Sequence, residues 1–142
     1  MKEEKFKVIN FIRELIIYID KNLENFPRKE IEIKNRIRNI SYELLELAYM
    51  ANITKYDKNK YIEEIIAKVK VLDFLLNLCY DKQIINSKRY VKFGEKMDDI
   101  LKYSIGWQKS ISENEKIGHS CDGWPLRVFM ITKAMLTSGL VL

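Results

Sequence analysis

Apolar residues recur at helical spacing in four segments of the chain. In residues 4–24 they stand three and four positions apart, at Val8, Ile12, Leu15, Ile19 and Leu23. Residues 26–53 repeat this spacing at Ile33, Ile37, Ile40, Leu44, Leu47 and Ala51. Such a stripe predicts an amphipathic helix that buries one face. Pro27 suits the first helical position of the second helix, because its missing N–H is not needed there.

Two more helices are predicted after polar turns. The third covers residues 58–80 and has its apolar stripe at Ile62, Ile65, Ile66, Val69, Leu72, Leu76 and Cys79. The fourth covers residues 87–109 and carries Tyr90, Phe93, Met97, Ile100, Ser104 and Trp107 on one face. Asp57 and Ser87 are predicted to cap these two helices, since their side-chain oxygens can accept a backbone N–H. Gly94 costs about 1 kcal/mol in a helix relative to Ala, which predicts close helix packing at that position.

Four long helices joined by short polar turns predict an all-α fold, an antiparallel up-down-up-down four-helix bundle over residues 1–111. Residues 112–142 form a C-terminal extension of a different kind, with the only His, three of the five Gly and an apolar end. Pro125 could start a short helix in this extension, and a read-through or processed segment is an equal alternative. We expect the bundle to close without the extension.

The residue inventory argues against a catalytic or metal-binding protein. His119 lies outside the four predicted helices, and Cys79 and Cys121 form no C-x-x-C pair, so neither a metal site nor a cofactor is expected. The adjacent carboxylates at 63–64 and 98–99 point in different directions on a helix and are expected to be solvated. No nucleophile with a base and no phosphate-binding glycine loop is found. We therefore predict that the protein is not an enzyme.

The chain also lacks the pattern of a membrane or secreted protein. Arg13 and Glu14 interrupt the first apolar stretch, which excludes a signal peptide and a membrane span there. No disulfide framework is present, so a reducing compartment is favoured. We expect a cytoplasmic protein with no membrane partner.

Positive charge is concentrated in the second and fourth helices. Residues 27–56 carry six cations against four acids, and residues 82–111 carry seven against three, within a formal net charge of +5. Most of the cations precede Glu43 and Glu46 in the second helix and Asp98 and Asp99 in the fourth, which opposes the helix macrodipole by a few tenths of a kcal/mol per charge. These two helices run parallel in an up-down-up-down bundle, so their basic halves should meet at one end. The predicted phosphate-binding residues are Arg28, Lys29, Arg36, Arg38, Lys88, Arg89 and Lys92, and a merely solvated basic face is the alternative.

A second apolar stripe lies on the predicted back of the second helix. Tyr42, Leu45 and Tyr49 are spaced by three and four residues and stand nearly opposite the buried stripe. A single bundle has no use for such a stripe, whereas an oligomer would cover it, and Tyr suits interfaces. We predict self-association through these residues, with cover by the first helix or the extension as the alternative.

Several stretches resemble the accessory variability determinant (Avd) family of diversity-generating retroelements. They are FPRKE at 26–30, IRNISYELLELAYMAN at 37–52, VLDFLLNLCYDKQIINSKRY at 71–90 and IGWQKS at 105–110. The resemblance implies a non-catalytic, homopentameric barrel that binds the retroelement's reverse transcriptase and its template, RNA or an RNA–DNA hybrid. A bundle protein encoded in a 23S ribosomal RNA intervening sequence and a protein-only scaffold remain the alternatives.

Overall fold

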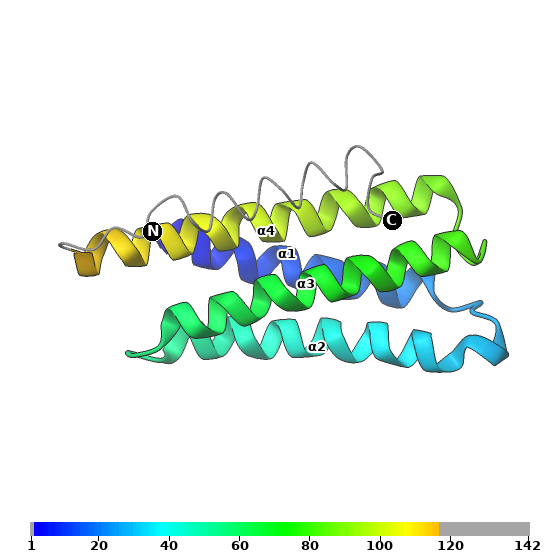
Figure 1. The fold of residues 1–142 in the computed structure, drawn as a ribbon, viewed down its shortest axis with the longest axis horizontal. Helices are drawn as coiled ribbons and strands as arrows, with labels where there is room; N and C mark the ends of the chain where they lie inside the picture. The colour runs from blue at the N-terminus through cyan, green and yellow to red at the C-terminus, as the bar shows by residue number, and fades with distance from the viewer. Residues whose placement is uncertain (1, 117–142) are drawn as a thin grey trace.

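The structure, a computed structural model, describes residues 2–116, and these residues form four α-helices and no strand. The helices are α1 (Lys2–Asn22), α2 (Ile31–Ile53), α3 (Lys58–Asp81) and α4 (Ser87–Lys116), with a single 3-10 turn, η1 (Arg28–Glu30), before α2. Successive helices run in opposite directions along one long axis (Figure 1). The predicted up-down-up-down bundle is thereby confirmed, while residues 117–142 of the proposed extension lie outside the described residues.

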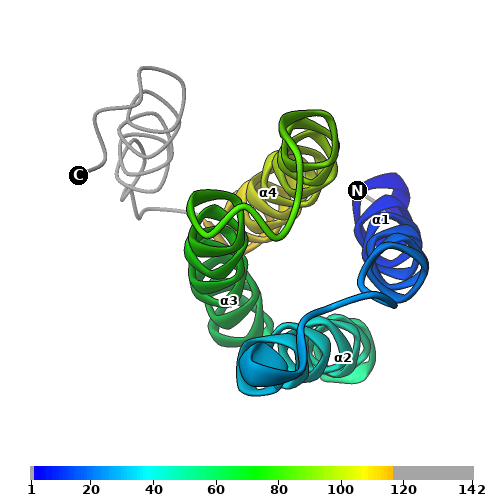
Figure 2. The ribbon, with the colours of Figure 1, turned by 90° about the vertical axis from the view of Figure 1, so that its right-hand side faces the viewer.

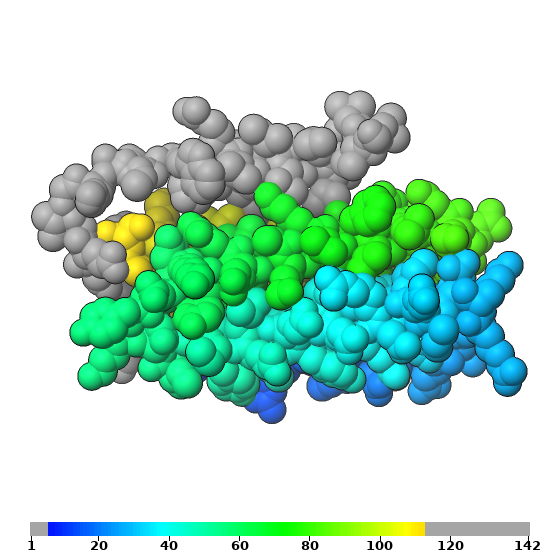
Figure 3. Space-filling view, turned by 60° about the horizontal axis from the view of Figure 1, so that its bottom comes forward, coloured from blue at the N-terminus to red at the C-terminus, as the bar shows by residue number. Residues whose placement is uncertain are grey.

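The four helices stand at the corners of a square (Figure 2). Each helix packs on two neighbours, α1 on α2 and α4, and α3 on α2 and α4. Figure 3 shows α2 and α3 packed side by side along their length. The parallel helices α2 and α4 therefore stand on a diagonal of the square.

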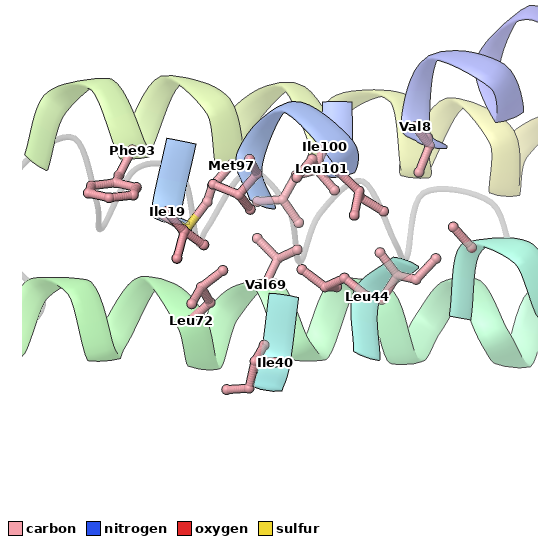
Figure 4. Packing of buried hydrophobic residues seen from close by; sticks show 14 of the residues in the cluster. Val8, Ile19, Ile40, Leu44, Val69, Leu72, Phe93, Met97, Ile100 and Leu101 are labelled. Carbon is pink, nitrogen blue, oxygen red and sulfur yellow. The ribbon is translucent and has the colours of Figure 1, made fainter. Parts of the chain in front are cut away.

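The predicted apolar stripes meet in the centre of the bundle. Phe93, Ile19, Leu44 and Leu72 come from four different helices and are almost completely buried, and Figure 4 shows core side chains pointing into the space between the helices. Two positions of the α2 stripe differ, since Ile33 and Leu47 are only half-buried while Ala48 is fully buried. A straight helix has 3.6 residues per turn, so a strict three-and-four repeat drifts off the buried face towards its ends.

The predicted starts of the third and fourth helices are right in position and wrong in mechanism, whereas α2 begins at Ile31, four residues after the predicted start at Pro27. Pro27 has extended geometry (φ −61°, ψ 140°) and precedes η1 rather than opening α2. Asp57 precedes α3 but has a left-handed φ of 66° and makes no side-chain capping bond. At α4 the cap is Asn86, whose Oδ1 accepts a hydrogen bond from the Arg89 N–H at 2.8 Å, while Ser87 is the first helical residue. Asn is as good a cap as Ser, so the two residues compete for one role.

Two further expectations about α4 are wrong. A Cβ added at Gly94 would meet no atom within 4 Å, so this glycine does not mark a close helix contact. The helix also continues to Lys116 rather than ending near Lys109. Neither Gly nor Pro interrupts residues 107–116, so local propensity does not oppose the continuation.

Candidate nucleic-acid interface

The N-terminal halves of α2 and α4 lie at the same end of the bundle, on the right of Figure 1. Figure 2 looks onto this end, where the chain passes from α1 to α2 and from α3 to α4. The cations predicted from the sequence are exposed here, with the exception of half-buried Arg38: Arg28, Lys29, Arg36, Lys88, Arg89 and Lys92. This end also carries Lys21 and Lys82, at the ends of α1 and α3.

The α2 cations do not share one face. Arg36 and Arg38 are two residues apart, so they point in nearly opposite directions from the helix. Arg38 Nη2 forms an ion pair with Asp20 Oδ1 of α1 at 2.8 Å, with 32% of its side chain exposed. This pair holds Arg38 against α1, whereas Arg36 stands on the other flank of α2. Because α2 and α4 stand on a diagonal of the square and not side by side, their cations form two groups rather than one.

The α4 cations are grouped instead with residues of α1. Tyr18 contacts Phe93 edge to face, with ring centroids 4.8 Å apart, and this contact fixes the register of α1 on α4. The Lys96 Nζ lies 5.3 Å from the centre of the Tyr18 ring. Burial raises the pKa of the Tyr18 hydroxyl, and the nearby Arg89 guanidinium partly opposes this rise. Arg89, Lys92 and Lys96 follow each other at steps of three and four and so lie along one line of α4.

A small polar pocket opens at the end of this line of cations. It has a volume of about 100 Å³ and is lined by Lys21, Asn22, Glu24, Asn25, Phe26, Ile84 and Arg89. Asn22 Nδ2 donates a hydrogen bond to the Tyr18 carbonyl oxygen at 2.8 Å, which anchors one wall. Two cations face one carboxylate around the pocket, so its lining carries a net positive charge. No local pattern in the sequence indicates this pocket, because its walls come from residues 21–26, from the turn before α4 and from α4 itself.

Burial shifts the pKa of one carboxyl group and of one thiol on α3. Burial, and secondly the nearby Asp98 carboxylate, raises the pKa of Asp73 to about 6. Cys79 is completely buried, as the sequence predicted, and burial raises the pKa of its thiol to about 11. Within residues 6–112, no group of three or more His, Cys, Asp or Glu side chains is arranged to hold a metal ion.

The predicted outer stripe of α2 is exposed in part. Tyr42 and Tyr49 have 49% and 43% of their surface accessible, whereas Leu45 is half-buried and packs against the core. The Arg38–Asp20 ion pair places this flank of α2 beside α1. Because α1 and α2 are antiparallel, this register also sets Ile17 of α1 at the level of Tyr42 along the bundle axis. Ile17 is 66% exposed. The two tyrosines therefore belong to an apolar surface that α1 extends rather than covers.

A second exposed apolar surface lies on the outer face of α3. Val71 and Phe74 are 45% and 60% exposed, and half-buried Leu78 continues the same line. The spacing of Ala67, Val71, Phe74 and Leu78 by four, three and four residues would have revealed this stripe in the sequence. The helix that carries it stands away from α1 in the square (Figure 2).

The chain was compared with family models, with curated proteins and with solved structures, and the first comparison gives a match. The family model described as bAvd-like matches residues 3–111, which is the whole of the predicted bundle apart from its first two residues. Neither the search of curated proteins nor the search of solved structures gives a match. None of the helices in the described part of the chain is long and apolar enough to cross a membrane.

Proposed function

Because this chain belongs to the bAvd-like family, the bacterial Avd family of diversity-generating retroelements, we propose that it binds a reverse transcriptase and its template nucleic acid through the basic end of the bundle. Membership of the family implies an accessory protein, and the family is non-catalytic. The proposed nucleic acid is RNA or an RNA–DNA hybrid. The family match favours this role over that of a ribosomal intervening-sequence protein.

The observation that carries the proposal is the gathering of exposed cations at one end. Arg28, Lys29, Arg36, Lys88, Arg89 and Lys92 project from a rigid helical scaffold, whereas the charge of Arg38 is compensated by its ion pair with Asp20. Phosphate contacts of this kind bind a backbone without reading its sequence. We therefore expect little preference among template sequences.

Self-association is part of the same proposal. A ring of more than two subunits uses two different surfaces of each subunit, because a single self-complementary patch closes at a dimer. Tyr42 and Tyr49 with Ile17 would form one surface, extended by half-buried Leu45, and the Val71–Phe74 stripe of α3 would form the other. Both surfaces are needed for the homopentamer that the family resemblance implies.

The nucleic-acid half of the proposal is tested by binding of labelled RNA and of an RNA–DNA hybrid over a range of salt. The logarithm of affinity should fall linearly with the logarithm of salt, by about 0.7 to 0.9 for each phosphate neutralised. Arg36→Glu with Arg89→Glu should weaken binding to every sequence alike, while Lys55→Glu with Lys60→Glu, at the opposite end, is the matched control. Absence of binding even at low salt would reject this half and leave a protein-only scaffold.

The oligomer is tested by light scattering at micromolar concentration. Tyr42→Glu with Tyr49→Glu, or Phe74→Glu alone, should each dissociate the assembly without loss of helicity, because a ring breaks when either surface fails. Val91→Glu changes a residue that is 57% exposed on α4 and should leave the mass unchanged. A monomer near 17.0 kDa in the unmodified protein would contradict the proposal.

A further inference from the structure

One group of cations at the basic end comes from α1 and α4, and the sequence pattern did not single out this combination. Lys96 and Arg89 lie near Tyr18, Lys92 stands between them on α4, and Lys21 follows Tyr18 by about one turn of α1. We refer to these five residues as the Tyr18 face. Lys21, Arg89 and Lys92 are exposed, and Lys96 is half-buried over the tyrosine ring. Lys21 and Arg89 also line the polar pocket of about 100 Å³.

We propose that the Tyr18 face is the main nucleic-acid-binding surface of this protein, and that its pocket receives a phosphate group of the backbone. The inference rests on the proposed function and assigns it to one side of the bundle, between α1 and α4. In this assignment Arg28 and Lys29 of η1 and Arg36 of α2 contribute long-range attraction rather than contact.

The geometry of the face suits a polyanion. Arg89 and Lys96 are seven residues apart, which is about 10 Å along the helix axis at 1.5 Å per residue. One duplex strand places a phosphate about every 3.4 Å along its axis, so the line of cations covers about three nucleotides. Glu24 is the one acidic residue in the pocket wall, and the amides of Asn22 and Asn25 supply additional donors there.

The α2 cations are less well placed for the same strand. Arg38 is held in its ion pair with Asp20, and Arg36 stands on the opposite flank of α2 from Arg38. Lys82, which lies at the same end, is paired with Glu30 Oε2 at 3.2 Å. A nucleic-acid strand that runs along α4 would therefore contact the Tyr18 face along its whole length.

The test compares three triple variants of the full chain, each of which lowers the formal net charge of +5 by three. The first is Lys21→Gln, Lys92→Gln and Lys96→Gln in the Tyr18 face. The second is Arg28→Gln, Lys29→Gln and Arg36→Gln at the start of α2. The third is Lys55→Gln, Lys60→Gln and Lys109→Gln, exposed residues at the other end of the bundle. Circular dichroism confirms that each variant is folded, and fluorescence anisotropy of a labelled RNA measures binding.

The Tyr18-face variant should lose at least about 10-fold in affinity, and its salt slope should be smaller by about 2 to 3 than that of the wild type. The other two variants should lose much less. Equal losses of affinity in all three variants would show an effect of net charge alone. A loss of affinity in the second variant as large as in the Tyr18-face variant would mean that the nucleic acid also contacts the start of α2. Either result overturns the inference while the proposed function survives, whereas failure of the wild type to bind RNA would reject both.

A further arm separates a polynucleotide from a free phosphate compound. Adenosine monophosphate, added at constant ionic strength, should not displace the labelled RNA, because a single phosphate engages only the pocket. Displacement by the mononucleotide would assign the pocket to a small phosphate ester and overturn the inference.

Discussion

Asp73 is the residue whose ionisation should most affect the stability of the bundle. It lies half-buried on α3, and burial together with the Asp98 carboxylate of α4 raises its pKa from 3.8 to about 6. A carboxylate that is harder to ionise in the folded state than in the unfolded state lowers stability wherever it is ionised. Replacement by Asn keeps the shape of the side chain and removes the charge.

The size of the effect follows from the shift. A difference of about 2 pKa units corresponds to about 3 kcal/mol, and screening at this half-exposed site reduces the figure to about 1 to 2 kcal/mol. The folded state binds the proton more tightly, so the stability of the wild type falls as pH rises from about 4 to about 6 and stays low above that range. Asp73→Asn should therefore stabilise the protein by about 1 to 2 kcal/mol at neutral pH and lose this advantage near pH 4.

Urea unfolding at about pH 4.5 and about pH 7.5, at one protein concentration, measures this difference. Glu64→Gln removes a fully solvated carboxylate from the same helix and is the matched control, with little change at either pH. If Asp73→Asn changes stability equally at both pH values, the Asp73 carboxylate is not destabilised by its surroundings and the α3–α4 packing described here is wrong in this region.

Three smaller predictions follow from local geometry. Gly94→Ala should raise stability by about 0.5 to 1 kcal/mol in thermal unfolding, because a Cβ there meets nothing within 4 Å. A loss of stability in this variant would mean that another helix or a partner approaches Gly94 closely. Gln83→Gly should also stabilise, by about 0.5 to 1 kcal/mol, since Gln83 follows the C-cap residue of α3 and has a left-handed φ of 64°. Cys79 should resist alkylation at about pH 8 in the native protein and react after unfolding, since burial raises its thiol pKa to about 11; rapid native labelling, read by mass spectrometry, would contradict the buried position.

The number, direction and buried faces of the helices were predictable from the sequence, because apolar spacing is a local signal. Most residues of the four central stripes, from Val8 on α1 to Trp107 on α4, were assigned correctly to the core, and the half-buried exceptions are Ile33, Leu47, Ile66 and Tyr90. Cap assignment failed where two good caps adjoin, as at Asn86 and Ser87, because only the hydrogen bond of Arg89 decides between them. The role of Gly94 failed for a different reason, since helix propensity alone does not say whether a neighbour is close.

The candidate site was harder to predict, because it depends on which helices are neighbours. Charge order along the chain indicated that α2 and α4 are basic at one end, but it could not show that they stand on a diagonal. Arg38 pairs with Asp20 of another helix, and Lys21 and Arg89 line one pocket from α1 and α4. Such contacts depend on the handedness and register of the bundle, which the helical repeat does not determine.

The central claim is that this bundle joins a reverse transcriptase to its template, and co-purification tests it most directly. The full chain is produced together with the reverse transcriptase of its retroelement and a template RNA, and the mixture is separated by size-exclusion chromatography with light scattering. We predict a single complex in which an oligomer of this chain carries the enzyme and the RNA, and from which the RNA is released at high salt. Elution of the chain apart from both the enzyme and the RNA at low salt would contradict the claim.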